Sequence, residues 1–213
     1  MQIVKMYPNN KIIFLPQTVW FEHEENMKAC AKTLSKHQNL TICARDKVSY
    51  EILKKNFTNE ILLVPDMAFC IDMNRWKKPN ATKEALLLKR EDKELKEDAE
   101  LTKLVEQGDV TICDWIPFTE DCWQKTGLRR TKKYMPFMYD WYAQNIFRPY
   151  MINSGVQLIG SHKKIYSTRL HAAILSILLD KAEDLTWFDN SYGKNSSFYE
   201  TWLSDVDGIQ FIK

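Results

Sequence analysis

The sequence predicts an α/β protein with mostly parallel sheets, and two observations lead to this prediction. Short apolar runs rich in β-branched and aromatic residues alternate along the chain with longer segments of helical periodicity. Such alternation is typical of parallel strands that are joined and covered by helices. The chain has 213 residues, 45% of them hydrophobic, which suffices for a packed core in one large or two small domains.

Seven short apolar runs are expected to form strands. They occupy residues 11–16, 40–44, 61–64, 84–89, 110–113, 164–167 and 185–188. The polar stretch 73–83 contains a proline and resembles a linker, so we place a boundary near residue 80. We predict a partial N-terminal Rossmann-like domain over 1–80 and a C-terminal Rossmann-like domain over 81–213 that ends in a helix. Three strands are few for an independent sheet, so the first part is an incomplete domain or shares a sheet with the second.

Helical periodicity fills the intervals between the expected strands. Apolar residues in segment 21–37 follow the spacing i, i+3, i+4 and i+7, and Asp46 is a suitable N-cap for a helix over 47–57. Further helices are expected over 92–108, 138–160, 166–179 and 196–206, the second of them bent or broken at Pro149.

Composition and charge exclude several classes of protein. The formal net charge of +2 lacks the basic excess of a general nucleic-acid binder. The five cysteines form no CxxC pair, which indicates buried free thiols in a reducing compartment, and the four histidines lack the spacing of a metal site. The first residues resemble no signal peptide, and no apolar run approaches the ~18 residues of a membrane span. We therefore expect a cytoplasmic protein without a metal.

Polar side chains follow five of the expected strands. Ligands of open parallel sheets bind beyond the carboxyl ends of the strands, so we expect these side chains to meet at one edge. They are Gln17, Arg45, Asp46, Asp66, Arg169, His171, Asp189, Asn190 and Ser191, with Lys194 close behind.

Arg169 and His171 fall in the first turn of an apolar helix, where the helix dipole disfavours cations. A bound anion between them would explain this placement. Arg45 and Arg169 suit two anionic groups of one small molecule, and a histidine beside them transfers protons near neutral pH. The predicted ligand therefore carries two anionic groups, or a phosphate leaving group beside a reacting centre.

Each of these residues also has an ordinary structural interpretation. Arg45 beside Asp46 fits a surface ion pair with a helix cap, and His171 fits a histidine packed under a loop. Asp66 and the run 189–191 suit turns, and Lys194 suits a solvated surface.

Five segments together resemble the polysaccharide pyruvyl transferase family. They are FLPQTVWF (14–21), ARDKVSYEIL (44–53), VPDMAF (64–69), STRLHAAIL (167–175) and FDNSYGKNSSFYETW (188–202). The segments occur in the family's order, and they span the chain from about residue 11 to 203. Their combination, with RLHA and DNSYGK together, is what carries the resemblance.

The resemblance implies transfer of a pyruvyl group from phosphoenolpyruvate to two sugar hydroxyls, which forms a cyclic ketal and releases phosphate. The acceptor is a surface polysaccharide or its lipid-linked precursor, so the protein is cytoplasmic or peripheral at the inner face of the membrane. The implied fold is GT-B-like, with two Rossmann-like halves facing a cleft. Arg45, Arg169 and Leu170 then surround phosphoenolpyruvate, His171 is the acid/base, and no cofactor is needed. The DNSYGK match adds Asp189, Asn190, Ser191 and Lys194 as candidate substrate-binding residues.

The sequence departs from the family pattern at its start. The Gly-rich GGGNxGD-like loop of the first domain is absent, so we expect an incomplete N-terminal domain. Its exposed sheet edge would pair in a homo-oligomer or with a partner chain. Two alternatives stay open: a GT-B-like glycosyltransferase that uses a nucleotide sugar, and a non-catalytic remnant that binds a sugar or a partner.

Overall fold

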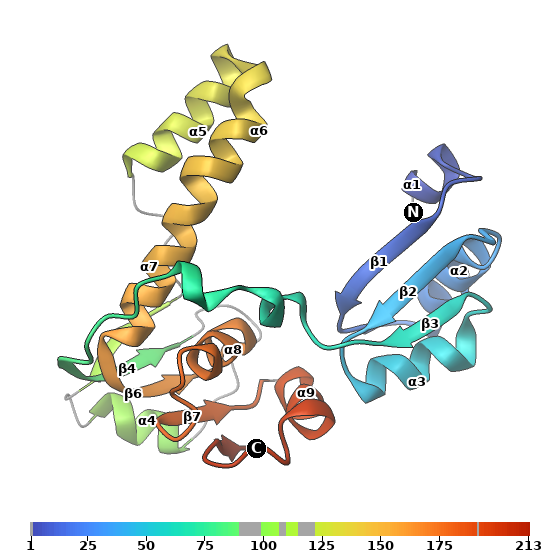
Figure 1. The fold of residues 1–213 in the computed structure, drawn as a ribbon. Coiled ribbons are helices and arrows are strands. Elements are labelled where there is room, and N and C mark those ends of the chain that lie inside the picture. Colours follow the sequence, from blue (N-terminus) through green and yellow to red (C-terminus); the bar gives the residue numbers. More distant parts are fainter. Residues whose placement is uncertain (1, 90–98, 107–109, 115–121, 191) are drawn as a thin grey trace. The chain divides into compact units, whose positions relative to one another are not determined.

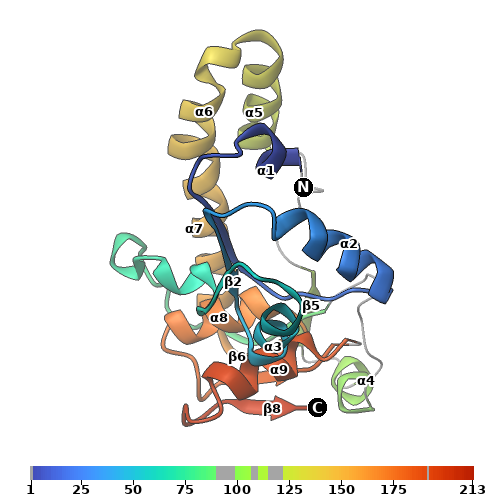
Figure 2. The same cartoon turned by 90° about the vertical axis from the view of Figure 1, so that its right-hand side faces the viewer.

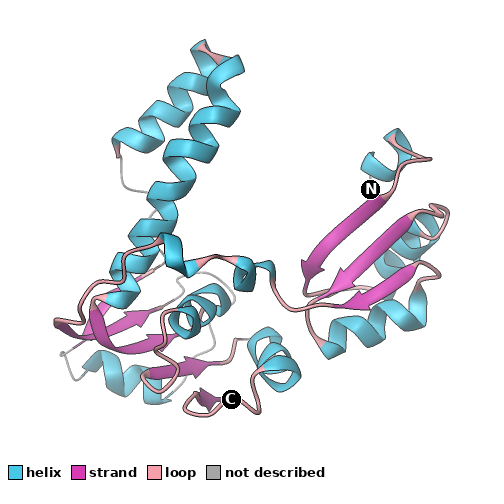
Figure 3. Cartoon of the chain, in the orientation of Figure 1, coloured by secondary structure: helices cyan, strands magenta, loops and turns pink. Residues whose placement is uncertain are grey.

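The computed structural model describes residues 2–89, 99–106, 110–114, 122–190 and 192–213. Contacts divide the chain into two compact units (Figure 1). Unit 1 comprises Met1–Ile71 and Tyr192–Val206, and unit 2 comprises Asp72–Ser191 and Asp207–Lys213. Each unit contains a sheet in which all strand pairs of the described residues are parallel (Figure 3). The predicted α/β class with parallel sheets is therefore confirmed.

Unit 1 is built on a three-stranded sheet in the order β1-β2-β3. Its elements are α1 (Gln2–Met6), β1 (Ile12–Gln17), α2 (Glu24–Leu34), β2 (Leu40–Ala44), α3 (Lys47–Asn56), β3 (Glu60–Leu63), the 3-10 helix η1 (Met67–Cys70) and α9 (Lys194–Trp202). The central strand β2 is buried along its whole length, and it packs in one apolar cluster with Leu34 of α2 and Leu53 of α3. The edge strand β1 alternates, because Ile12 and Phe14 pack on this cluster whereas Ile13 and Leu15 are exposed.

Unit 2 is built on a five-stranded sheet in the order β5-β4-β6-β7-β8. Its strands are β4 (Lys83–Leu88), β5 (Val110–Cys113), β6 (His162–Ser167), β7 (Leu185–Phe188) and β8 (Gln210–Ile212). Its helices are η2 (Met73–Arg75), α4 (Ala99–Glu106), α5 (Trp123–Tyr134), η3 (Pro136–Met138), α6 (Tyr139–Tyr142), the π-helical η4 (Ala143–Phe147), α7 (Arg148–Gly160) and α8 (Leu170–Leu178). Helix α8 packs on α7, β6 and β7, and its run Ala172–Leu175 is buried.

The sequence predicted most of these elements and missed a few. All seven expected strands form within two residues of the predicted bounds, but β8, α1 and α5 were not anticipated. Pro149 does not break the helical run: it occupies the first turn of α7, where no backbone N–H is needed, and the irregularity is the π-helical η4 just before it. The expected domain ranges 1–80 and 81–213 stay predictions; contacts group α9 with unit 1.

One expectation about the strand ends was wrong. The five polar strand ends do not share one sheet edge, because β1, β2 and β3 belong to one sheet and β6 and β7 to another. Gln17 ends β1, and Arg45 and Asp66 follow β2 and β3, all in unit 1, whereas Arg169 and Asp189 follow strands of unit 2. The candidate site residues fall into two sets that we describe separately.

Candidate functional site

Arg45 follows β2 and is held by several parts of unit 1. Its Nε donates to Oγ1 of Thr18 at 2.7 Å, and its Nη1 donates to Oδ2 of Asp66 at 2.9 Å. Its backbone carbonyl accepts a hydrogen bond from Nε1 of Trp202 in α9 at 2.7 Å. The Arg45 side chain is 16% exposed. A guanidinium has five N–H donors, so these contacts orient Arg45 and leave donors for an anion.

Asp46 is a fully buried carboxylate at the centre of this cluster. Oδ1 accepts from the backbone N–H of Ser49 at 2.8 Å and from Oγ of Ser197 at 2.9 Å. Oδ2 accepts from the hydroxyls of Thr18 and Ser49, both at 2.9 Å. The predicted N-cap is therefore confirmed, and the carboxylate partner of Arg45 is Asp66 rather than Asp46. A buried charge needs this many donors to offset its desolvation.

Arg169 is the N-cap residue of α8 in unit 2. Its Nε and Nη2 donate to the two carboxylate oxygens of Asp114, each at 2.5 Å. Asp114 follows β5 and Arg169 follows β6; both strands flank β4, so the pair bridges the carboxyl edge of the sheet. The Oγ of Ser167 accepts the Arg169 backbone N–H at 3.0 Å. This forked arrangement fixes the plane of the guanidinium.

The other residues of the RLHA segment lie on the first turn of α8. Leu170 is buried in the core of unit 2, and His171 is exposed. Cys113 precedes Asp114, and burial raises the pKa of its thiol, with the Asp114 carboxylate adding to the rise. Cys113 therefore stays a neutral thiol near pH 7 and is a poor nucleophile. His171 is the histidine at this edge in the described residues.

Asp189 and Asn190 follow β7, which neighbours β6. Oδ1 of Asp189 accepts the backbone N–H of Asn190 at 2.8 Å, and Asn190 is buried. Ser191 lies outside the described residues. Lys194 belongs to unit 1, with its Nζ 5.3 Å from the centre of the Tyr192 ring.

The structure thus groups Arg45 with Lys194 in unit 1, and it groups Arg169, Leu170, His171, Asp189 and Asn190 in unit 2. Sequence reasoning overlooked Asp114 and Thr18. Asp114 directly follows β5, and Thr18 directly follows β1. Ligands of parallel sheets bind beyond the carboxyl ends of the strands, so a search of the residues after every strand would have found both.

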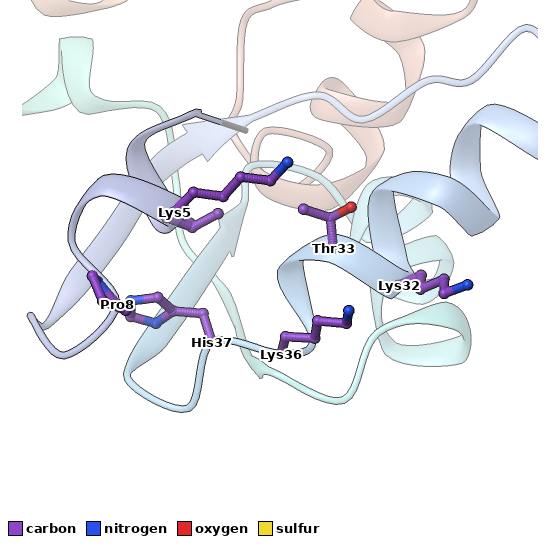
Figure 4. A pocket seen from close by; sticks show the side chains of 7 residues that line it. Lys5, Pro8, Lys32, Thr33, Lys36 and His37 are labelled. Carbon is purple, nitrogen blue, oxygen red and sulfur yellow. The ribbon is translucent and has the colours of Figure 1, made fainter.

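Two pockets in the described residues are lined by none of Arg45, Arg169 and His171. One, of about 310 Å³, is lined by Lys5 and Pro8 near the N-terminus together with Lys32, Lys36 and His37 (Figure 4). It lies where β1 and β2 begin, opposite the edge that bears Arg45. The other, of about 510 Å³, lies in unit 2 and includes Asp114 in its lining.

The described ranges show neither a metal-binding cluster nor a membrane-spanning helix. They hold no cluster of three or more histidine, cysteine or acidic residues suited to a metal ion. No helix there combines the length and apolarity needed to cross a bilayer. All five cysteines are free; Cys43 is buried as expected, whereas Cys70 is exposed.

Comparison with known proteins decides the family. Residues 1–182 match the family described as polysaccharide pyruvyl transferase. The chain belongs to this family. It is 31% identical over its whole length to the putative pyruvyl transferase EpsO of Bacillus subtilis, of which it covers 66%. Pyruvyl transferase 1 of Schizosaccharomyces pombe is 25% identical over 99% of the chain, which covers 52% of that protein. The resemblance predicted from the five segments is therefore confirmed.

One further relative and one solved structure are also similar to this member of the pyruvyl transferase family. General stress protein 30 of B. subtilis is 29% identical over 99% of the chain, which covers 57% of it. A crystal structure of the functionally uncharacterised protein KP1_0663 from Klebsiella pneumoniae superposes with a TM-score of 0.64 at 17% identity. The chain aligns in full with that structure and covers 68% of it, which shows a shared fold. The chain spans between about half and two thirds of the length of its curated relatives.

Proposed function

We propose that this chain transfers a pyruvyl group from phosphoenolpyruvate to two hydroxyls of a saccharide and forms a cyclic ketal. Its membership of the polysaccharide pyruvyl transferase family supports the reaction class. The arrangement of side chains at the carboxyl edge of the unit 2 sheet supports the roles that we assign to Arg169 and His171. There, Asp114 orients Arg169, and the exposed His171 stands two residues further on. A fixed guanidinium beside a titratable imidazole suits an enol phosphate, which needs anion binding and proton transfer.

In the proposed mechanism, protonated His171 donates a proton to C3 of phosphoenolpyruvate, and C2 becomes electrophilic. One sugar hydroxyl adds to C2 and gives up its proton to the now neutral His171, which restores the acid. Phosphate then leaves, and the second hydroxyl closes the ketal as its proton goes to the departing phosphate. Arg45 and Arg169 hold the carboxylate and the phosphate of the donor and stabilise the developing charge. The scheme uses neither a metal nor an organic cofactor.

The finer features of this proposal rest on the family and on surface properties. We propose a GT-B-like arrangement of two Rossmann-like halves, with Asp189, Asn190, Ser191 and Lys194 contacting substrate. The acceptor belongs to exopolysaccharide synthesis, as a polysaccharide or a lipid-linked precursor, so the protein acts in the cytoplasm or at the inner face of the membrane. The exposed apolar face of β1, an edge strand of its sheet in the described residues, supports pairing with another chain.

The test measures ketal formation and phosphate release from phosphoenolpyruvate with a panel of saccharides. We expect His171→Asn to reduce turnover by about 100-fold or more, because general acid catalysis supplies factors of that size. The matched control is His23→Asn, which changes an exposed histidine at the N-cap of α2.

Full turnover in the His171→Asn variant would overturn the acid role. Calorimetric binding of UDP or GDP without binding of phosphoenolpyruvate would favour a glycosyltransferase. Binding of phosphoenolpyruvate without turnover by any acceptor would favour the non-catalytic alternative.

A further inference from the structure

A basic, aromatic helical hairpin extends from unit 2. We call residues 122–150 the arm; it comprises α5, η3, α6 and η4 and the start of α7. Figures 1 and 2 both show α5 and α6 side by side beyond the part of α7 that packs on the sheet. The close packing of α5 is against η3, α6 and η4, so the hairpin is held mainly by its own residues.

A close helix contact gives the arm its shape. A Cβ at Gly127 would lie 2.1 Å from the hydroxyl oxygen of Tyr142, so the glycine leaves room for the end of this ring against α5. Thr131 of α5 is buried, and its hydroxyl bonds to the carbonyl of Leu128. The inner face of α5 thus packs against its neighbour and leaves the outer face uncovered.

The arm exposes large aromatic side chains near its tip. Phe137 is 82% exposed, Tyr134 68% and Trp141 55%. Single exposed apolar residues are ordinary, but several on one projecting hairpin mark an interaction surface. The arm holds eight of the 26 aromatic residues of the chain in 29 residues.

The arm also concentrates positive charge. It contains six lysines and arginines and one aspartate, a formal charge of +5, whereas the whole chain carries +2. The remainder of the chain is therefore acidic, at −3. Lys132 and Lys133 are exposed beside the tip and form no ion pair within the described residues. The Nζ of Lys133 lies 4.9 Å from the centre of the Tyr134 ring.

We propose that the arm docks this protein onto an anionic lipid surface. Aromatic rings favour the membrane–water interface, and lysine and arginine are drawn to anionic headgroups. Protein interfaces are instead depleted in lysine, which disfavours a protein partner at the lysine-flanked tip. Phe137 enters the interfacial layer, and Lys132 and Lys133 contact lipid phosphates. This inference rests on the surface of the arm and does not depend on the transferase proposal.

Co-sedimentation of the purified chain with vesicles tests the proposal. We expect binding to vesicles of phosphatidylglycerol and phosphatidylcholine, and much weaker binding to phosphatidylcholine alone or at high salt. Lys132→Gln with Lys133→Gln should weaken binding about 25-fold, at about fivefold per charge. Phe137→Ser should weaken it about tenfold or more. All three residues are exposed, so the variants keep the fold, which circular dichroism checks.

The matched control is the double variant Lys54→Gln, Lys55→Gln. These two lysines are also exposed, adjacent and in the last turn of a helix, and Lys54 lies over the Tyr50 ring as Lys133 lies over that of Tyr134. This variant should bind vesicles like the unaltered chain. Equal loss in both double variants, or no binding by the unaltered chain, would overturn the proposal. So would sedimentation equilibrium showing that Phe137→Ser dissociates an oligomer while vesicle binding is unchanged, because the arm would then join copies of the chain.

Discussion

The two arginine sites of this protein are held in different ways. In unit 1, Arg45 lies beside the buried carboxylate of Asp46, which accepts four hydrogen bonds from three residues. In unit 2, Arg169 is oriented by the partly exposed carboxylate of Asp114, which is 32% exposed. Because Asp46 is fully buried and Asp114 is partly exposed, we expect the first site to contribute more to the stability of its unit, and we expect the second to affect the proposed ligand binding more than stability. Two changes test this difference, and a third tests the pH dependence of unit 2; they follow from the largest expected effect to the smallest.

The largest effect is expected for Asp46→Ala. The change leaves the buried hydroxyl of Ser49 and the half-buried hydroxyls of Thr18 and Ser197 without their acceptor, at about 1–3 kcal/mol for each polar group not rehydrated. We expect the free energy of unfolding to fall by about 3–5 kcal/mol, measured by urea denaturation.

Two control variants give smaller losses of stability with which the Asp46→Ala result is compared. Ser197→Ala removes one of the four donors and should cost about 1 kcal/mol. Asp72→Ala removes an exposed aspartate that also caps a short helix, by accepting from the N–H of Asn74, and should cost at most about 1 kcal/mol. If Asp46→Ala cost no more than Asp72→Ala, the stabilising role of the buried carboxylate would be wrong.

A smaller effect on stability and a larger one on binding are expected for Asp114→Asn. The variant loses the charge that fixes Arg169, so calorimetry should show phosphoenolpyruvate binding weakened about tenfold or more. Asp66→Asn is the matched change in unit 1. There, Thr18 still accepts from Nε of Arg45, and the single amide oxygen accepts from either Ala68 or Nη1 of Arg45. Arg45 therefore keeps at least one of its two side-chain hydrogen bonds, and binding should weaken less than about threefold. An equal or larger loss for Asp66→Asn would reverse the comparison.

The smallest effect is a pH dependence that belongs to unit 2. Burial lowers the pKa of His162, whose Nδ1 lies 2.7 Å from the carbonyl oxygen of Leu158. Below about pH 6.5 the unfolded chain binds a proton at this histidine that the folded chain resists. Stability is therefore greatest above that pH and falls as the pH falls through the lowered pKa.

Thermal unfolding between about pH 5 and 8 checks this expectation. His162→Asn keeps a donor for Leu158 and removes the titration, so its melting temperature should vary less with pH. His23→Asn, at an exposed histidine, should leave the pH profile of the original chain unchanged. A profile that His162→Asn does not flatten would show that another group causes the dependence.

Local patterns predicted much of the fold. The runs at 40–44, 110–113 and 185–188 became strands with the same bounds, because short stretches rich in β-branched and aromatic residues favour extended backbone. The run 40–44 is buried throughout, whereas 110–113 is a partly exposed edge strand. Asp46 became the N-cap of α3 for an equally local reason, since its carboxylate reaches a backbone N–H three residues away. Helix α5 was not predicted, because its many basic residues leave no clear apolar periodicity in the sequence. Its packed face is narrow and lies around Gly127 and Thr131.

The candidate site was predicted in part. The sequence identified Arg45, Arg169 and His171 from their positions after strands and from the family segments, and the functional roles of these residues stay predictions. It included Asp66 among the polar strand ends without pairing it with Arg45, and it did not identify Asp114 as the partner of Arg169. Asp66 and Asp114 are 21 and 55 residues away from their partners along the chain, and such pairs form only when sheet order brings strand ends together.

The sequence by itself determined the α/β class, the strands, the cap at Asp46 and the family, because each depends on neighbouring residues or on ordered segments. Tertiary structure alone decided that the strands form two sheets and that α9 packs with unit 1, where Ser197 reaches Asp46 across 151 residues of sequence. It also decided that α5 stands in an exposed arm. Contacts between residues far apart in the sequence depend on how whole helices and strands pack, and the local spacing of residues does not predict them.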